Sequence, residues 1–306
     1  MDKNVIEASN WDNIYVDKLD DLLDIFDSYK RKKWVFRGHH DQVVDITSKF
    51  DRLFDSKNLR SDLLQIENEF IDKDINLFVD QNKNIIYFQN LKYLWLGKLK
   101  HYEGPTRLVD WSSDPLVASF FMCYKNWGDF GEVWAFDAEE YNRIGSEQWK
   151  GFVPPYEELK NEVLSSNSNL PQSDIDTQIG LFQFLKYISK LFFDINQNDK
   201  PFFMCLQNPW NFTRIKNQKG FFTISSDFGT SHSTAITNLF GNRREFCKRY
   251  IVPSIIIKKL EKYLLEEEHL CAETLGLLDD RPFENYIMEK TSEIKSRYRN
   301  YLIPTT

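Results

Sequence analysis

Helical and strand-like segments follow one another irregularly along this chain, and their order limits the folds that it can adopt. Apolar residues recur at helical spacing over residues 17–33 and 59–79. A regular alternation of strands and helices would predict a doubly wound parallel sheet. Here the strand-like runs do not alternate regularly with helices, so we predict an α+β fold with a mixed, mostly antiparallel sheet and several packed helices. The strand-like runs cover residues 34–38, 131–137, 201–206, 220–225 and 247–252.

The composition is that of a folded chain with a sizeable core. The 306 residues are 42% hydrophobic and 28% charged, with 12 Gly and 10 Pro. This is too little Gly and Pro for a fibrous or disordered chain. Aromatic residues make up 15% of the chain. That share indicates a core or a pocket built from flat rings.

Charge and cysteine content exclude several classes of protein. The chain has 39 Lys and Arg against 46 Asp and Glu, a formal net charge of −7. This balance disfavours a globally basic nucleic-acid or membrane binder but not a local basic face. The four cysteines form no C-x-x-C pair, and neither a long apolar run nor a secretory signal is present. We therefore expect a cytoplasmic protein without a membrane partner.

The chain is expected to form one main domain with additions at both ends. We predict an N-terminal helical preface over residues 1–33, a main domain over residues 34–253, and C-terminal helices over residues 254–306 that pack on the same domain. Residues 161–179 are rich in Ser, Asn and Asp and contain no Lys or Arg. This composition predicts an exposed, mobile surface excursion.

Residues 101–115 carry the densest set of chemically useful side chains. An imidazole, a phenol, a guanidinium, a carboxylate and an indole occur between His101 and Trp111. A helix start follows, with Ser113 or Asp114 as the N-cap and Pro115 at the first helical position. Helix N-termini favour anions through their free N–H groups and their dipole. The segment therefore predicts a site for a phosphate-bearing, ring-containing ligand.

Within this segment two interpretations remain open. In the first, which we prefer, Arg107 holds phosphate while Tyr102 and Trp111 stack a heteroaromatic ring. In the second, Arg107 and Asp110 form a buried pair that fixes a turn, and Trp111 belongs to the core. A buried pair adds little net stability compared with apolar packing, so its presence would need another reason.

The triplet Phe36-Arg37-Gly38 also suggests anion binding. An arginine fork can grip a phosphate or carboxylate through two parallel hydrogen bonds. The glycine that follows would let a ligand approach the backbone closely. Taken alone, the triplet is better explained as a strand-end arginine paired with a core carboxylate.

Metal and polyanion binding receive less support. His39 and His40 are adjacent, so on a strand they would point to opposite faces and could not share one metal ion. We therefore expect no metal site. Residues 243–262 contain seven basic side chains against two glutamates. This region could face a polyanion, but we prefer to interpret it as the solvated side of a strand and a helix.

Four segments together resemble the FRG domain family. They are Phe36-Arg37-Gly38, HYEGPTRLVDWSSDPLVASFF at residues 101–121, GEVWAFD at residues 131–137 and QKGFF at residues 218–222. The family's second signature is close to H-Y-G-x-P-T-R-L-L-D-W-T-x-N-P-L-V-A-L. The chain departs from the family at Glu103 where Gly is favoured, at Val109 for Leu, and at His39 where Gln is common. The first departure affects the turn after Tyr102, because a non-glycine residue resists positive φ.

The resemblance implies a role in phage defence or toxin-like conflict, with an antitoxin or a phage protein as a partner. A weaker, fold-level resemblance links the chain to bacterial ADP-ribosyltransferases. They carry an aromatic-Arg-Gly strand whose arginine holds NAD, then a Phe-x-Ser-Thr-Ser-like strand and a Glu-bearing strand. Arg37, residues 220–225 and Glu245 occur in that order here. This resemblance implies an ADP-ribosyltransferase-like fold, an NAD pocket and transfer of ADP-ribose to an unknown acceptor.

These resemblances and motifs assign a role to each candidate residue. Cleavage of the nicotinamide bond creates an oxocarbenium-like ribose that needs a nearby carboxylate. Glu245 is the candidate from the analogy and Asp110 the candidate from the central motif, while His101 would hydrogen-bond ribose hydroxyls. The residues expected to hold the cofactor NAD are Arg37, Gly38, Tyr102, Thr106, Arg107, Trp111 and Gln218.

Two further possibilities concern the acceptor of the ADP-ribose and whether the pocket cleaves a bond at all. Residues 243–262 could receive a protein or nucleic-acid acceptor. In a rival hypothesis the pocket only senses a nucleotide or captures a phage protein, and no bond is broken.

Overall fold

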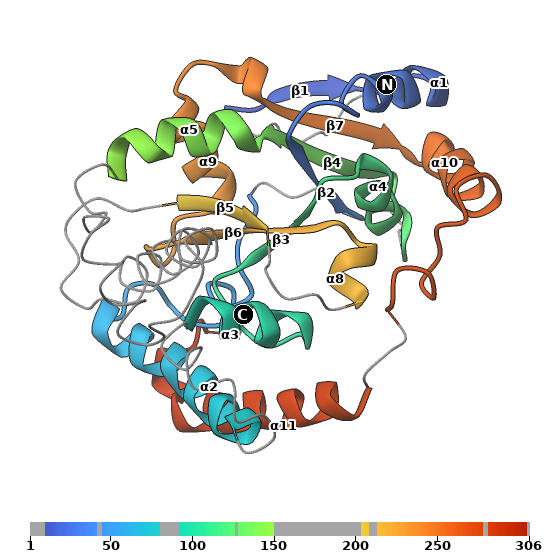
Figure 1. Cartoon of the computed structure of the whole chain (residues 1–306). Coiled ribbons are helices and arrows are strands. Elements are labelled where there is room, and N and C mark those ends of the chain that lie inside the picture. Colours follow the sequence, from blue (N-terminus) through green and yellow to red (C-terminus); the bar gives the residue numbers. More distant parts are fainter. Residues whose placement is uncertain are drawn as a thin grey trace, which may run out of the picture.

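Seven strands form one sheet with the order β1-β7-β4-β2-β3-β6-β5 (Figure 1). The computed structural model describes residues 10–41, 45–79, 92–125, 128–149, 203–207, 213–277 and 281–304. Among these residues every strand pair is antiparallel except β1–β7, which is parallel. The predicted α+β fold with a mixed, mostly antiparallel sheet is confirmed. The strands are β1 Asp12–Tyr15, β2 Trp34–His39, β3 Val109–Ser112, β4 Phe130–Asp137, β5 Phe203–Gln207, β6 Gly220–Ser225 and β7 Cys247–Pro253.

Helices cover both faces of this sheet and one end of it. Helices α1, α4 and α10 share a buried apolar cluster with one face of β2, β4 and β7. Helices α5 and α9 pack on the opposite face, and α2 and α11 lie side by side at the far end with α3 next to α2 (Figure 1). Two short 3-10 helices cover Arg244–Phe246 and Arg299–Tyr301. The α-helices are α1 Leu19–Asp27, α2 Arg60–Val79, α3 Lys92–His101, α4 Pro115–Cys123, α5 Ala138–Trp149, α8 Thr213–Asn217, α9 His232–Phe240, α10 Ser254–Glu266 and α11 Arg281–Arg297.

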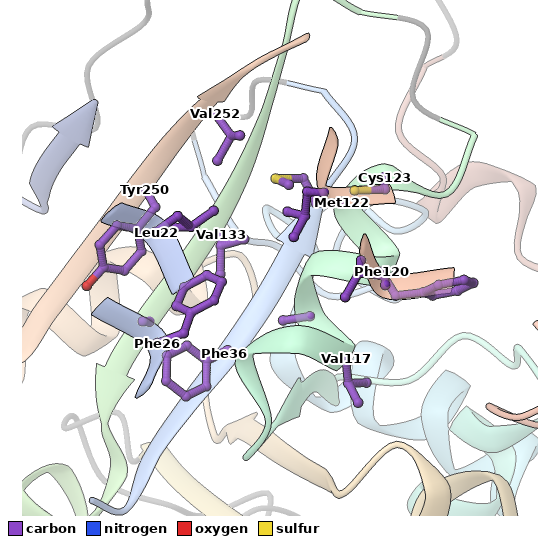
Figure 2. Close-up of a cluster of buried hydrophobic side chains, with 14 of the residues drawn as sticks. Leu22, Phe26, Phe36, Val117, Phe120, Met122, Cys123, Val133, Tyr250 and Val252 are labelled. Atoms are coloured by element: carbon purple, nitrogen blue, oxygen red, sulfur yellow. The ribbon is translucent and has the colours of Figure 1, made fainter. Parts of the chain in front are cut away.

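Helix α4 begins as its sequence predicts. The Asp114 carboxylate accepts a hydrogen bond from the backbone N–H of Leu116 at 2.8 Å, and Pro115 occupies the first turn. The helix is apolar on nearly all sides because it lies between the sheet and α10. Figure 2 shows Phe120 and Met122 of this helix in the cluster that also holds Phe36 of β2.

Gly38 allows β2 to lie close to α4. A Cβ atom at this position would stand 1.9 Å from the Ala118 carbonyl oxygen and 2.6 Å from the Met122 nitrogen. Both atoms belong to the α4 backbone and cannot rotate away. We expected Gly38 to admit a ligand to the backbone. The structure instead gives it a packing reason, although Gly38 also lines the cavity described below.

Several elements differ from the sequence prediction. The first helix ends at Asp27 and does not continue to Lys33, because the Ser28 side chain caps the Ile25 carbonyl and the chain then turns. Strands β1 and β3 have four residues each, too short for an alternating pattern to stand out. The predicted excursion at residues 161–179 lies outside the described residues. In the described part of the chain, no helix has the length and apolar character needed to cross a bilayer.

The Gly38 contact generates a test of the fold. Gly38→Ala should lower the free energy of unfolding by about 3 kcal/mol, because the methyl group forces β2 and α4 apart and overpacking carries costs of that order. The matched control is Gly220→Ala, whose Cβ would meet the Ile215 side chain at 3.1 Å and the Ile215 carbonyl oxygen at 3.4 Å, without the close backbone clash found at Gly38. Urea unfolding of both variants measures the difference. Equal stability of the two variants would contradict the packing role of Gly38.

Candidate functional site

A cavity of about 450 Å³ lies where β2 and β3 diverge. In the part of the chain that the structure describes, these strands are joined through one residue pair, Phe36 opposite Ser112. By contrast, β2 pairs with β4 over six residues and β3 pairs with β6 over four. The cavity therefore lies beside the strand pair of the described sheet that is joined by the fewest residues. From the two strands it is lined by Phe36, Arg37, Gly38, His39, Asp110, Trp111 and Ser112.

Three helices and the adjoining segments complete the walls. Helix α3 contributes its C-terminal end, α4 contributes one residue from each half together with the two residues that follow it, and α8 contributes Arg214 and Ile215. The principal side chains from these elements are Lys100, His101, Glu103, Val117, Phe121, Tyr124, Lys125, Arg214, Ile215 and Gln218. The remaining lining residues are His40, Arg52, Gly220, Phe221 and Phe222.

The cavity is basic although the protein is acidic. Its described lining contains five Arg and Lys side chains and only two carboxylates, in a chain whose formal net charge is −7. The carboxylates are Glu103 and Asp110. Like charges gathered in an enclosed site raise the local potential and attract a ligand of opposite sign. The lining therefore favours an anionic ligand.

Arg37 crosses the gap between the two strands. Its Nε donates a hydrogen bond to His39 Nε2 at 3.0 Å, and its Nη1 donates to the Asp110 carbonyl oxygen at 2.7 Å. Nη1 also lies 3.7 Å from the Asp110 carboxylate. Burial lowers the pKa of Arg37, and the Asp110 charge opposes that shift. The guanidinium is therefore held on both sides before any ligand arrives.

Asp110 is the carboxylate that faces Arg37. It forms an ion pair with Lys100, whose Nζ lies 2.6 Å from Oδ2. Burial raises the pKa of Asp110, but the charges of Lys100 and Arg37 outweigh this and the pKa ends below its ordinary value. The Asp110 side chain is 48% exposed, and this exposed part lies at the cavity. Asp110 is therefore an ionised carboxylate available to a ligand.

His39 is neutral in this arrangement. Burial lowers its pKa well below the ordinary value, and the adjacent Arg37 charge acts in the same direction. Because Nε2 accepts the hydrogen bond from Arg37, the ring proton is assigned to Nδ1. His40 also lines the cavity. His40 follows the end of β2, so strand alternation does not fix the direction of its side chain.

Glu103 adopts the left-handed conformation that glycine favours, with φ of 60°. The residue follows the end of α3, where the backbone N–H of Gly104 bonds back to the Leu99 carbonyl at 2.8 Å. Its carboxylate lies 3.2 Å from Arg214 and 3.9 Å from Lys49. The departure from the family pattern thus keeps the turn and adds a negative charge to the cavity wall.

Arg107, which we preferred as a phosphate ligand, does not line the cavity, and the alternative pair with Asp110 is not formed either. It is fully buried and pairs with Glu67 of α2, with Nη2 and Nε at 2.7 and 2.9 Å from the carboxylate. Its Nη1 donates to the Ser225 carbonyl at 2.9 Å. Glu67 lies 40 positions upstream, so no local pattern could identify it as the partner. Arg107 ties α2 to β6.

Trp111 belongs mainly to the core. Its Nε1 donates to Thr223 Oγ1 at 2.9 Å, and its ring packs against Phe136 with centroids 4.8 Å apart. It also contributes to the cavity wall. Of the two earlier interpretations, the structure favours the core role for this residue.

Three other candidates lie outside the lining. Tyr102 packs against the apolar cluster between α2 and α11, and Thr106 is fully buried with its hydroxyl facing the Leu108 N–H. Glu245 is exposed on the 3-10 helix before β7, which is separated from β2 by β4. The structure therefore does not bring these residues to Arg37. By contrast, His101 and Gln218 do line the cavity.

Sequence reasoning missed several lining residues. Lys100 directly precedes the central motif, so its place at the end of α3 could have been suspected from helical spacing. Arg214 and Tyr124 lie in no motif that we recognised. Their signal is only three-dimensional, since α8 and the end of α4 meet β2 and β3 across the cavity.

The buried Arg107–Glu67 pair generates a second test. Glu67→Gln should destabilise the fold by about 3–5 kcal/mol, because it leaves the Arg107 charge buried without its counter-charge. The control is Glu139→Gln, which removes a surface pair with Lys33 whose side chains are 62% and 75% exposed. Such a surface pair contributes about 0–1 kcal/mol. Chemical unfolding distinguishes the two, and a Glu67→Gln loss as small as the control's would show that Arg107 is not structural.

Comparisons with known proteins agree with part of the resemblance. Residues 32–128 match the model of the FRG domain, a range that contains β2, α2, α3, β3 and α4. It includes Arg37 and Asp110 but ends before β4, so residues 131–137 and 218–222 lie outside the match. No curated protein and no solved structure matches the chain. Residues 32–128 of this protein are an FRG domain.

Proposed function

We propose that the cavity beside β2 and β3 binds a phosphate-bearing nucleotide, with NAD as the first candidate. The observation that carries this proposal is a basic cavity in an acidic protein, with Arg37 already held across the strand gap. The cavity of about 450 Å³ lies within the roughly 300–1,000 Å³ usual for small-molecule sites.

The lining supplies both chemistries that a nucleotide requires. Lys100, Arg214 and Arg37 come from α3, α8 and β2 and suit phosphate oxygens. Phe121 and Tyr124 come from α4 and the residue after it and suit a base. The Tyr124 ring is 37% exposed and stacks on Phe120 with centroids 5.3 Å apart. We therefore assign phosphates to the cationic walls and the base to the α4 side.

The contact expected from Arg37 differs from the two-point grip that the sequence suggested. Nε is occupied by His39 and Nη1 by the Asp110 carbonyl, whereas Nη2 forms no hydrogen bond with the described residues. Arg37 would then meet a phosphate through Nη2, with Lys100 nearby. This arrangement still requires arginine, because one lysine ammonium cannot hold both neighbours at their positions and also reach a ligand.

Transfer of ADP-ribose is the second candidate, and Asp110 is the observation that favours it. An ionised carboxylate beside Arg37 can stabilise an oxocarbenium-like ribose as the nicotinamide bond breaks. Glu245 does not support that role, because it is exposed outside the lining. The alternative of a sensing module requires the same cavity without bond cleavage. A role in phage defence or toxin-like conflict is what the FRG resemblance implies for either activity.

A polyanionic acceptor on residues 243–262 receives less support. Several basic side chains of this region are already neutralised. Arg249 is buried against Glu132, and Lys248 lies 2.6 Å from Asp12. Arg243 pairs with Glu140 at 3.1 Å. The acceptor is therefore better sought at the cavity itself.

Arg37 provides the main test of nucleotide binding. Arg37→Ala and Arg37→Lys should both weaken NAD binding by about 30-fold or more. Alanine removes the hydrogen-bonded charge, whereas lysine keeps the charge but loses the fixed contacts of the guanidinium. The matched control is Lys262→Ala, whose side chain is 72% exposed on α10. Isothermal titration measures affinity, and melting curves confirm that each variant is folded. Full binding by Arg37→Lys would contradict the geometric role of the guanidinium.

A substitution at Asp110 distinguishes transfer of ADP-ribose from nucleotide sensing without bond cleavage. If the protein cleaves NAD, Asp110→Asn should abolish release of free nicotinamide while NAD affinity stays within about tenfold, since the amide keeps the shape but not the charge. Chromatographic detection of nicotinamide and titration of NAD measure both quantities on one preparation. NAD binding by the unmodified protein without nicotinamide release would instead support the sensing module.

A further inference from the structure

We propose that His39 is a positioning residue that holds Arg37 for an anionic ligand while the imidazole is neutral, and that acidification releases this hold. The inference rests on the proposed function, because it concerns the same cavity. It goes beyond that function in assigning a pH dependence to ligand binding. The argument starts from the two hydrogen bonds that fix the Arg37 guanidinium.

The Arg37 guanidinium donates one hydrogen bond to β2 and one to β3. Nη1 reaches the main chain of β3 at Asp110, and Nε reaches the His39 ring on its own strand. A main-chain carbonyl accepts a hydrogen bond at any pH. An imidazole nitrogen accepts only when it carries no proton. The His39 contact, at 3.0 Å, is thus the one of the two that protonation can break.

The surroundings of His39 are predominantly cationic. Its neighbours are Arg37 on β2 and His40 directly after the strand, and the Arg52 and Arg249 charges act on it from other segments. The residue opposite it on β4 is Glu132.

Glu132 cannot serve as a partner for a charged imidazole, and the Asp110 carboxylate on β3 is shared between Lys100 and Arg37. Glu132 is fully buried and already pairs with Arg249, and its second oxygen accepts from Trp134 Nε1 at 2.9 Å. These contacts, together with burial, keep His39 neutral near pH 7, and the pKa of His39 is lowered well below 6.5.

The direction in which pH changes anion binding follows from the contacts of His39. Above its lowered pKa, His39 accepts from Arg37 and the guanidinium stays aligned. Below that pKa, the ring nitrogen carries a proton, the hydrogen bond is lost and two positive groups face each other. Anion binding should therefore weaken as pH falls. A histidine that itself gripped the anion as a cation would give the opposite dependence.

The substitution His39→Gln separates positioning from simple packing. The Gln amide oxygen can accept from Arg37 Nε and does not titrate. This variant should bind NAD at pH 7.5 within about threefold of the unmodified protein and lose the weakening at acid pH. His39→Leu fills the space without an acceptor, so it should bind about tenfold more weakly at both pH values. His269→Gln is the matched control and should keep the full pH dependence, since His269 is exposed and lies outside the cavity lining.

The experiment measures the affinities of these four proteins for NAD and for inorganic pyrophosphate between pH 7.5 and 4.5. We expect the unmodified protein and His269→Gln to lose affinity in parallel on acidification, and His39→Gln to keep it. A His39→Gln profile that follows the unmodified protein would overturn the inference. Tighter binding at low pH, removed by His39→Gln, would also overturn it, because His39 would then act as a cation.

A ligand-free measurement separates a failure of this inference from a failure of the proposed function. Nitrogen NMR of the unliganded protein should show an unprotonated His39 Nε2 bonded to the Arg37 Nε–H near pH 7. This bond should disappear on acidification in the unmodified protein, whereas His39→Gln should retain its Arg37 contact. If neither NAD nor pyrophosphate binds at pH 7.5, the proposed function fails. Absence of the Arg37–His39 bond at neutral pH overturns the positioning role whether or not a ligand binds.

Discussion

The cavity exists because β2 and β3 are joined at a single point of the sheet. Beyond Phe36 and Ser112 the two strands would ordinarily continue to pair, with Arg37 opposite Trp111 and Gly38 opposite Asp110. They separate instead, and the Arg37 side chain takes over part of the connection through the Asp110 carbonyl. A side chain that replaces a main-chain bond can also meet a ligand. The strand pair joined by the fewest residues in the described sheet is for this reason also the place where the cavity lies.

Elsewhere in the protein, ion pairs keep positive charge from accumulating. Arg249 and Arg107 are each buried against one glutamate. At the cavity the cations outnumber the carboxylates, and Asp110 is shared between Lys100 and Arg37. Mutual repulsion of these cations works against folding unless an anion offsets it. Binding of an anion would therefore also stabilise the fold around the cavity.

The sequence predicted the elements with strong local signals and missed those without them. The cap and proline before α4 and the long apolar spacing of α2 identified these helices closely. The four-residue strand β3 was missed, since a short segment between a turn and a helix start shows no clear period.

The candidate site residues show the same difference between those with a local sequence signal and those without one. Arg37, Asp110, His101 and Gln218 were identified from motifs and do meet at one cavity. The partner of Arg107 could not be found in this way, because a buried charge pairs with whichever carboxylate the tertiary fold brings to it. Glu245 was placed by analogy with another fold, and analogy does not fix the position of an exposed residue.

Gly38 also determines which part of the molecule can yield when a ligand enters. Because β2 lies against the α4 backbone with no space for even a methyl group, the strand and the helix must behave mechanically as one body. Four paired residues bind β3 to β6, and five bind β6 to β5, so these three strands form a second body. In the described sheet the two bodies are joined through the pair Phe36 and Ser112, so any separation of the strands would turn about that pair. Opening of the cavity would then be a rotation about one residue pair. The hydrogen bond from Arg37 on β2 to the Asp110 carbonyl on β3 would limit how far the strands can separate.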